Sequence, residues 1–262
     1  MTVERPDDEM RVELLIDACW AAGAIGVEDL GDHIRAAFTD EETATGLAAA
    51  TGGSVGAVED TSGLDDWRAF AERHDAGPFR IRPPWMAPTD DGIDLCIDPG
   101  HAFGSGSHTT TRLVLTALAD HVTAGDHVLD LGTGSGVLAV AAARLGATVD
   151  AVDVDPAAEP AVLANAEANG VADRVEVRIG DIADLEPTAC DVVLLNVTID
   201  VHEQVAAAVR RIDPDRLLIA GILDGEQATR AAELHGREPV AAAVDGEWTV
   251  LVFDHGRSAR PS

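Results

Sequence analysis

The sequence predicts an α/β protein: a mostly parallel sheet covered by helices on both faces, preceded by a small α+β domain. Strand-like and helix-like segments alternate from about residue 128 to residue 234, which is typical of β–α–β units. A turn of three alternating glycines follows the first strand of this series. Residues 240–244 and 248–253, joined at Asp245-Gly246, predict a closing antiparallel hairpin.

The first part of the chain predicts a ferredoxin-like α+β domain over residues 1–64. The expected elements are a helix over 9–23, strands over 24–30 and 34–38, a helix over 40–50 and a strand over 55–58. No catalytic constellation stands out in it. Residues 65–77 are expected to form a linker helix, residues 78–256 the larger domain, and residues 257–262 a frayed tail.

In the larger domain, each strand and helix is expected where an apolar run or a helical period is bounded by turn residues. The expected strands are 79–82, 93–97, 128–131, 149–153, 175–179, 192–196 and 217–220, and the expected helices are 109–118, 137–145, 156–169, 201–211 and 225–234.

The composition is strongly acidic, with 47 acidic and 18 basic residues and a net charge of −29. All of the basic residues are arginine, and hydrophobic residues make up 46% of the chain, so a folded protein is expected. Acids spread over every segment predict a solvated shell adapted to molar salt, as in a halophile. Such a charge argues against direct nucleic-acid binding, which needs basic surfaces, and favours a basic protein partner.

Several classes of protein are not expected. Cys19, Cys96 and Cys190 lack the spacing of a zinc site and suit free thiols in a reducing cytosol. No stretch approaches the roughly 20 apolar residues of a membrane span, and the polar N-terminus is no signal peptide. A cytoplasmic protein without membrane contact is therefore expected.

The run from Val128 to Gly136, followed 17 residues later by Asp153, predicts a site for a nucleoside cofactor. Glycines allow a sharp turn and close approach to a ligand, and an acid after the next strand can bind ribose hydroxyls. Asp130, two residues before the first glycine, would repel a diphosphate but could sit near a cationic amino-acid cofactor. This pattern resembles the S-adenosylmethionine site of Rossmann-like methyltransferases, with NAD as the alternative cofactor.

The candidate residues follow successive strands, where ligands of open α/β sheets bind. Gly132 and Gly134 are expected to pass beside the methionine part, Asp153 to hold the ribose and Asp181 to contact the adenine. Asn196, after a buried strand, is expected to hold the acceptor amine as the catalytic residue and to touch the cofactor. The alternatives are a turn cap for Asp181 and a strand-end cap for Asn196.

A glycine-rich loop over residues 98–111 is the second signal. Phe103 lies within it, and the loop is expected to close over the cofactor, while Thr111 at the start of the next helix could reach the methionine carboxylate. No metal site is expected from His101 and His108. No general base is evident, because Asp200 and His202 are both expected on the surface.

Residues 97–111 match the signature DPGxAFGTGxHxTT, and further matches are residues 128–156, Asn165 to Gly170, Gly221-Ile222-Leu223 and Gly246-Glu247-Trp248. In these motifs the chain resembles the PrmA-type methyltransferases that modify ribosomal protein L11. The resemblance implies a class I methyltransferase sheet, methylation of amino groups on that protein, recognition by the N-terminal domain, and cofactor contacts at Thr111, Gly132, Asp153 and Asn196. Two departures are a first N-terminal strand expected to be missing, and Gly104-Ser105-Gly106-Ser107 where threonine is usual.

The sequence therefore predicts a protein N-methyltransferase that uses S-adenosylmethionine to modify lysine side chains, an N-terminal amine, or both, on ribosomal protein L11. One alternative is a methyltransferase with the same core that acts on another protein lysine or on a small amine. The other is a protein that binds a nucleoside cofactor without catalysis.

Overall fold

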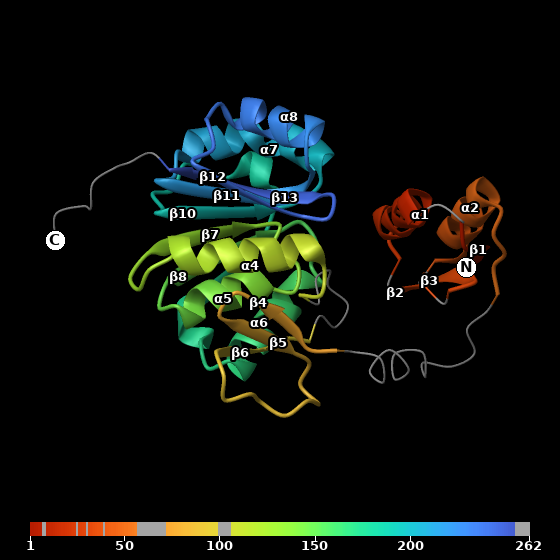
Figure 1. Ribbon diagram of the computed structural model, residues 1–262, viewed down its shortest axis with the longest axis horizontal. Helices are drawn as coiled ribbons and strands as arrows, with labels where there is room; N and C mark the ends of the chain where they lie inside the picture. The colour runs from red at the N-terminus through yellow and green to blue at the C-terminus, as the bar shows by residue number, and fades with distance from the viewer. Residues whose placement is uncertain are drawn as a thin grey trace. The chain divides into compact units, whose positions relative to one another are not determined.

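The computed structural model describes residues 1–6, 9–24, 26–29, 31–38, 40–56, 72–98 and 106–254 (Figure 1). The chain divides into two compact units, Met1–Phe70 and Ala71–Ser262. Each unit is described by itself.

The first unit is a three-stranded antiparallel sheet with two helices. Its elements are β1 (Thr2–Glu4), α1 (Glu9–Ala21), β2 (Gly26–Asp29), β3 (His33–Ala37) and α2 (Glu41–Thr51). The sheet order is β1-β3-β2, and Thr2 also forms an antiparallel bridge with Ser54 on the outer side of β1. This is the β–α–β–β–α succession of a ferredoxin-like domain, with Ser54 where its last strand would pair.

Two expectations for this unit were wrong. The first strand is present as β1, because backbone pairing with β3 does not require apolar side chains. Its residue Val3 is buried. The bridge to β1 falls at Ser54, whereas a strand was expected from Val55; Val55 and Gly56 are not in a strand.

The second unit begins with a small sheet of β4 (His74–Ala76), β5 (Phe79–Arg82) and β6 (Ile93–Cys96). Strand β4 is antiparallel to β5, and β6 is parallel to it. The linker helix expected over 65–77 is wrong at its end, because residues 74–76 pair with β5 as a strand; residues 65–71 lie outside the described part. This pairing also places the start of the second unit before residue 78.

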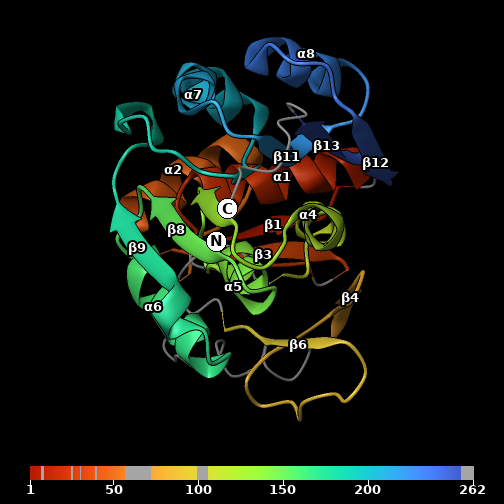
Figure 2. The same cartoon turned by 90° about the vertical axis from the view of Figure 1, so that its left-hand side faces the viewer.

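The main sheet has seven strands in the order β12-β13-β11-β10-β7-β8-β9, with β9 and β12 at opposite ends of the row (Figure 2). Five neighbouring strands are parallel to one another: β11, β10, β7, β8 and β9. Strand β13 runs antiparallel between β11 and β12. The bounds are β7 (His127–Leu131), β8 (Thr148–Asp153), β9 (Val175–Ile179), β10 (Val192–Asn196), β11 (Arg216–Leu223), β12 (Ala241–Asp245) and β13 (Trp248–Asp254).

Helices cover both faces of this sheet, with α4, α5 and α6 on one side and α7 and α8 on the other (Figure 1). Their bounds are α4 (Thr109–His121), α5 (Val137–Arg144), α6 (Ala158–Ala168), α7 (Ile199–Ile212) and α8 (Glu226–His235), with short 3₁₀ turns η1 (Ala172–Arg174) and η2 (Ile182–Asp184). The inserted antiparallel strand confirms the predicted class I sheet with its terminal hairpin.

The core lies in two layers, one on each face of the sheet. Val192 to Leu195 of β10 are fully buried, as expected for a central strand of a covered parallel sheet. The layer under α4–α6 continues into the small sheet through Phe79, Ile81 and Leu95. The layer under α7 and α8 includes Leu195, Val209 and Phe253. Of the helices in the described ranges, none combines the length and the apolar character needed to cross a membrane.

Candidate functional site

The glycine turn connects β7 to α5 and leaves no room for side chains. Gly132, Gly134 and Gly136 have φ angles of 73°, 53° and 80°, in the left-handed region that glycine adopts without strain. A Cβ atom on Gly132 would lie 2.7 Å from Val197 Cγ1, and one on Gly136 would lie 2.9 Å from Val162 Cγ1. The turn therefore exposes bare backbone at the carboxyl end of the sheet.

Asp153 ends β8 beside this turn, and two backbone N–H groups orient its carboxylate. Gly134 donates to Oδ2 at 2.8 Å, and Asp155 donates to Oδ1 at 2.9 Å. Gly132 also donates to the Val152 carbonyl at 2.8 Å, which joins the turn to the end of β8. A carboxylate oxygen accepts more than one hydrogen bond, so both oxygens keep capacity for ligand hydroxyls. This arrangement fits the ribose of a nucleoside cofactor.

Thr111 and Asn196 meet although they are 85 residues apart. The Asn196 Nδ2 atom donates to Thr111 Oγ1 at 3.4 Å, from the end of β10 to the first turn of α4. Thr111 is buried, and Asn196 is half-buried. Helix α4 is capped by His108, whose Nδ1 accepts from the Thr110 N–H.

The Thr111–Asn196 pair and the glycine turn belong to one region, because Val197, which follows Asn196, packs against Gly132. Asp181 makes its hydrogen bond elsewhere, to a residue that is not among the candidates. It is exposed and caps η2, where its Oδ1 accepts from the Ala183 N–H at 2.8 Å, which is the capping role considered as its alternative. Phe103 and His101 lie outside the described residues.

Asp130 is turned inward, although the sequence argument placed it near the cofactor. It is 1% exposed, and its Oδ2 accepts from Thr133 Oγ1 at 2.6 Å and from the Ala139 N–H at 3.1 Å. Burial raises the pKa of this carboxyl to about 7, and the charge of Asp153 acts in the same direction. Asp130 therefore joins the glycine turn to the first turn of α5 from within the core.

His202 was expected on the surface and is instead fully buried, on the inward face of α7. Its Nε2 lies 3.0 Å from the Ala220 carbonyl and its Nδ1 lies 3.1 Å from His235 Nε2 on α8. Burial lowers the pKa of His202, and burial lowers that of His235 to about 3, helped by His202, Arg210 and Arg237. The Nδ1 atom of His235 has no hydrogen-bond partner among the described residues. Asp200 is exposed, as expected.

Asn165 was not predicted as a site residue; it is 2% exposed on α6, and its Nδ2 donates to the Ser135 carbonyl in the glycine turn. Its signal is the pair of asparagines four residues apart, since positions i and i+4 share one face of a helix.

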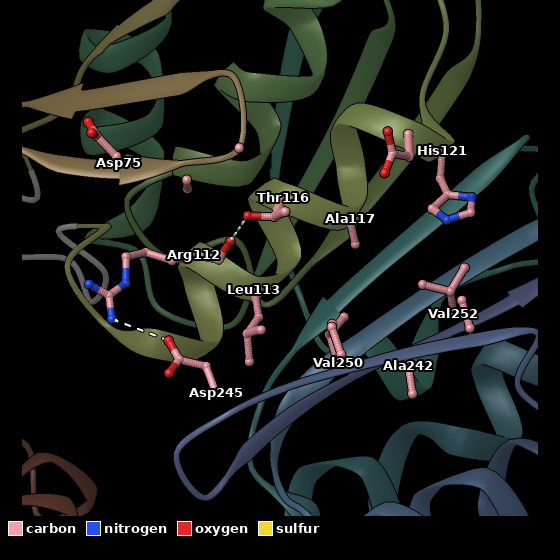
Figure 3. A pocket seen from close by; sticks show the side chains of 15 residues that line it. Asp75, Arg112, Leu113, Thr116, Ala117, His121, Ala242, Asp245, Val250 and Val252 are labelled. Carbon is pink, nitrogen blue, oxygen red and sulfur yellow. Dashed lines mark hydrogen bonds and ion pairs between the residues drawn. The ribbon is translucent and has the colours of Figure 1, made fainter.

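A separate groove of about 470 Å³ lies between α4, the β12–β13 hairpin and the β4–β5 turn (Figure 3). Its floor is apolar, with Leu113, Ala117 and Val250, and Arg112 pairs with Asp245 across its mouth at 3.8 Å. None of the described cofactor candidates lines this groove.

In the described part of the chain, no three His, Cys, Asp or Glu side chains gather in a way that could hold a metal ion. The side chains of Cys19, Cys96 and Cys190 are buried.

Comparison with known proteins identifies the family. A family profile described as ribosomal protein L11 methyltransferase (PrmA) matches residues 33–255. The ribosomal protein L11 methyltransferase of Thermus thermophilus is 40% identical over 201 residues, covering 75% of this chain and 78% of that protein. The protein of the same name from Deinococcus radiodurans is 34% identical and covers 91% of this chain and 93% of its own length.

A solved structure shows the same fold. The crystal structure of the ribosomal protein L11 methylase from Lactobacillus delbrueckii subsp. bulgaricus superposes with a TM-score of 0.60 at 24% identity, over 68% of this chain and 96% of that one. The profile match and the curated relatives together show that this chain belongs to the ribosomal protein L11 methyltransferase (PrmA) family and is a methyltransferase that uses S-adenosylmethionine.

Proposed function

We propose that this enzyme methylates amino groups of ribosomal protein L11, on lysine side chains, the N-terminal amine, or both. The observation that carries the proposal is the 34% identity to the Deinococcus radiodurans protein over nearly the whole of both chains, including the small unit. The net charge of −29 supports a basic protein partner and does not favour direct binding of nucleic acid.

Within the site, we infer that Gly132 and Gly134 border the methionine part of the cofactor and that Asp153 binds its ribose hydroxyls. The fixed carboxylate of Asp153 and the bare backbone of the turn support this placement. Thr111 is assigned to the methionine carboxylate, Asp181 to the adenine, and Phe103 to the covering loop. The Oδ1 atom of Asp181 also accepts from the Ala183 N–H in capping η2.

Asn196 is the residue proposed to hold the acceptor. When bound, S-adenosylmethionine supplies an electrophilic methyl group on a sulfonium centre. Because that leaving group is already good, the protein mainly has to orient a neutral amine and keep water away. Asn196 Nδ2 is directed to Thr111, so its Oδ1 is available to accept an amine N–H.

The small unit is proposed to recognise the ribosomal protein. It contains none of the residues assigned to the cofactor, all of which lie in the second unit. A cytoplasmic location follows from a ribosomal substrate and is part of the same proposal.

The test is mass spectrometry of purified ribosomal protein L11 incubated with enzyme and S-adenosylmethionine in molar potassium chloride. We expect mass increments of 14 Da that map to lysines or to the N-terminus. The Asn196→Ala variant should lose at least tenfold in rate at saturating cofactor while keeping its fold. Methylation of free RNA or of a small amine, without methylation of L11, would refute the substrate assignment.

A further inference from the structure

Asn165 of α6 and Asn169, which caps the C-terminus of that helix, bind the backbone of the chain as it leaves β6. Asn169 accepts from the Cys96 N–H at 2.9 Å and donates to the Cys96 carbonyl at 2.7 Å. Asn165 makes the same pair of bonds with Asp98, both at 2.9 Å. Alternate residues of an extended chain point their backbone groups to one side, and helix positions i and i+4 share a face. The two amides thus replace a neighbouring strand.

Asn165 alone of this pair also reaches the glycine turn. Its Nδ2 donates a second hydrogen bond to the Ser135 carbonyl at 2.9 Å, and Ser135 stands between Gly134 and Gly136. The second bond of Asn169 Nδ2 goes to the Asn165 carbonyl of its own helix at 2.7 Å. Both side chains therefore bind the backbone at or just after the end of β6, but only Asn165 also binds the glycine turn.

The packing around Asn165 leaves it one orientation. Its two N–H donors face the carbonyls of Asp98 and Ser135, and its Oδ1 faces the Asp98 N–H. The same helix touches the turn again at Val162, against Gly136. Because interior atoms are closely packed, movement of the turn away from α6 would break both contacts.

We propose that Asn165 is a positioning residue of the cofactor site, which ties Ser135 of the glycine turn to Asp98. This inference rests on the assignment of the turn to the cofactor. The bond holds the backbone that presents Gly132 and Gly134 in one position relative to Asp98, which lies two residues after the end of β6. Asn169 supports the same segment without reaching the turn, so its role is in folding alone.

The first test compares Asn165→Ala with Asn169→Ala by calorimetric titration with S-adenosylmethionine. Both variants lose hydrogen bonds that are at least partly buried, so both should melt at a lower temperature than the wild type. Only Asn165→Ala should raise the cofactor Kd, by about tenfold or more, while Asn169→Ala stays within twofold. Equal changes in Kd for the two variants, or an unchanged Kd for Asn165→Ala, would overturn the proposal.

A second test uses the unmodified protein and remains decisive if Asn165→Ala does not fold. Hydrogen exchange is measured at the Cys96 and Asp98 amides, with and without S-adenosylmethionine. Ligand binding should slow exchange at Asp98 by a larger factor than at Cys96. The reason is that Asn165, which binds Asp98, also binds the glycine turn, whereas Asn169, which binds Cys96, does not. Equal slowing at both amides would contradict it. Neither test uses a protein substrate, so an incorrect substrate assignment would leave both results unchanged.

Discussion

The two units of this protein differ in how charge and buried structure are distributed. Residues 1–70 carry 16 acidic and four basic residues, a net charge of −12, whereas residues 71–262 carry 31 and 14, a net charge of −17 over a much longer chain. The buried apolar cluster of the first unit comprises nine of its described residues, such as Val12, Cys19 and Ile34. The second unit has a core layer on each face of its sheet.

This difference favours the proposed assignment of cofactor binding to the second unit and of target recognition to the first. Every described cofactor candidate belongs to the second unit, where backbone N–H groups and buried side chains fix its position. The first unit combines the higher charge density with the smaller described core. A surface of that kind is suited to attracting a basic partner, and less suited to holding reacting atoms within a fraction of an ångström.

Removal of the first unit should have the largest effect. Deleting residues 1–70 is expected to lower methylation of ribosomal protein L11 by at least 100-fold, while the Kd for S-adenosylmethionine changes by less than twofold. The second unit has its own core, so it should retain cooperative unfolding. Calorimetric titration and mass spectrometry of L11 would measure the two quantities. A truncated enzyme that still methylates L11 at the normal rate would remove the first unit from target recognition.

Lowering the salt concentration should destabilise the first unit more than the second. Lowering the salt from molar to ~0.1 M lengthens the screening distance from ~3 to ~10 Å, so that many more like charges repel one another. The first unit, with more net charge per residue, should lose structure at a higher salt concentration than the second. Hydrogen exchange followed along a potassium chloride series would show the order. Equal protection of both units in low and high salt would contradict the predicted adaptation to molar salt.

The sequence predicted the elements of the second unit well because each depends on local pattern. The 17-residue spacing from Gly136 to Asp153 lies within a single β–α–β unit, so the chain itself brings these residues together. Contacts between distant segments were not predictable in this way. The meeting of Asn196 with Thr111, and that of Asn165 with Asp98, depend on sheet order and helix packing across 85 and 67 residues.

Two further differences have physical explanations. Strand β4 forms because β5 pairs with it, which no local propensity at residues 74–76 indicates. His202 was expected outside although it shares a helical face with Val205, Ala206 and Val209, at spacings of three, four and seven residues. That periodicity is the signal that would have identified it as buried.

Substitution of Asp153 should produce a smaller effect, confined to the second unit. Asp153→Ala removes the acceptors proposed for two ribose hydroxyls, and bonds to a charged group contribute ~1.5–3 kcal/mol each, so the Kd for S-adenosylmethionine should rise tenfold or more. Asp155→Ala is the matched control, because Asp155 Oδ1 accepts only from the Ala157 N–H among the bonds seen here and should leave the Kd nearly unchanged. Similar losses in both variants would point to damage to the turn and not to a lost ribose contact.

The smallest effect expected is a dependence of stability on pH at His235. Its pKa in the folded protein is lowered to about 3, from an ordinary value of 6.5, chiefly by burial. Below pH 6.5 the unfolded chain therefore binds a proton that the folded protein does not. Stability from this group is fully present above pH 6.5 and falls as the pH is lowered, by about 1.4 kcal/mol at pH 5.5.

Asp130 acts in the opposite direction, so the wild-type pH profile alone cannot isolate His235. The pKa of Asp130 is raised to about 7, so folding keeps a proton that the unfolded chain releases above pH 3.8, and acidification from pH 7 restores stability. The measurement is therefore the difference between wild type and His235→Gln in denaturant unfolding at pH 7.5 and 5.5, in which the Asp130 contribution cancels. Between these two pH values the wild type should lose about 1.4 kcal/mol more than the variant. Parallel pH profiles for the two proteins would show that His235 is not buried in the neutral form.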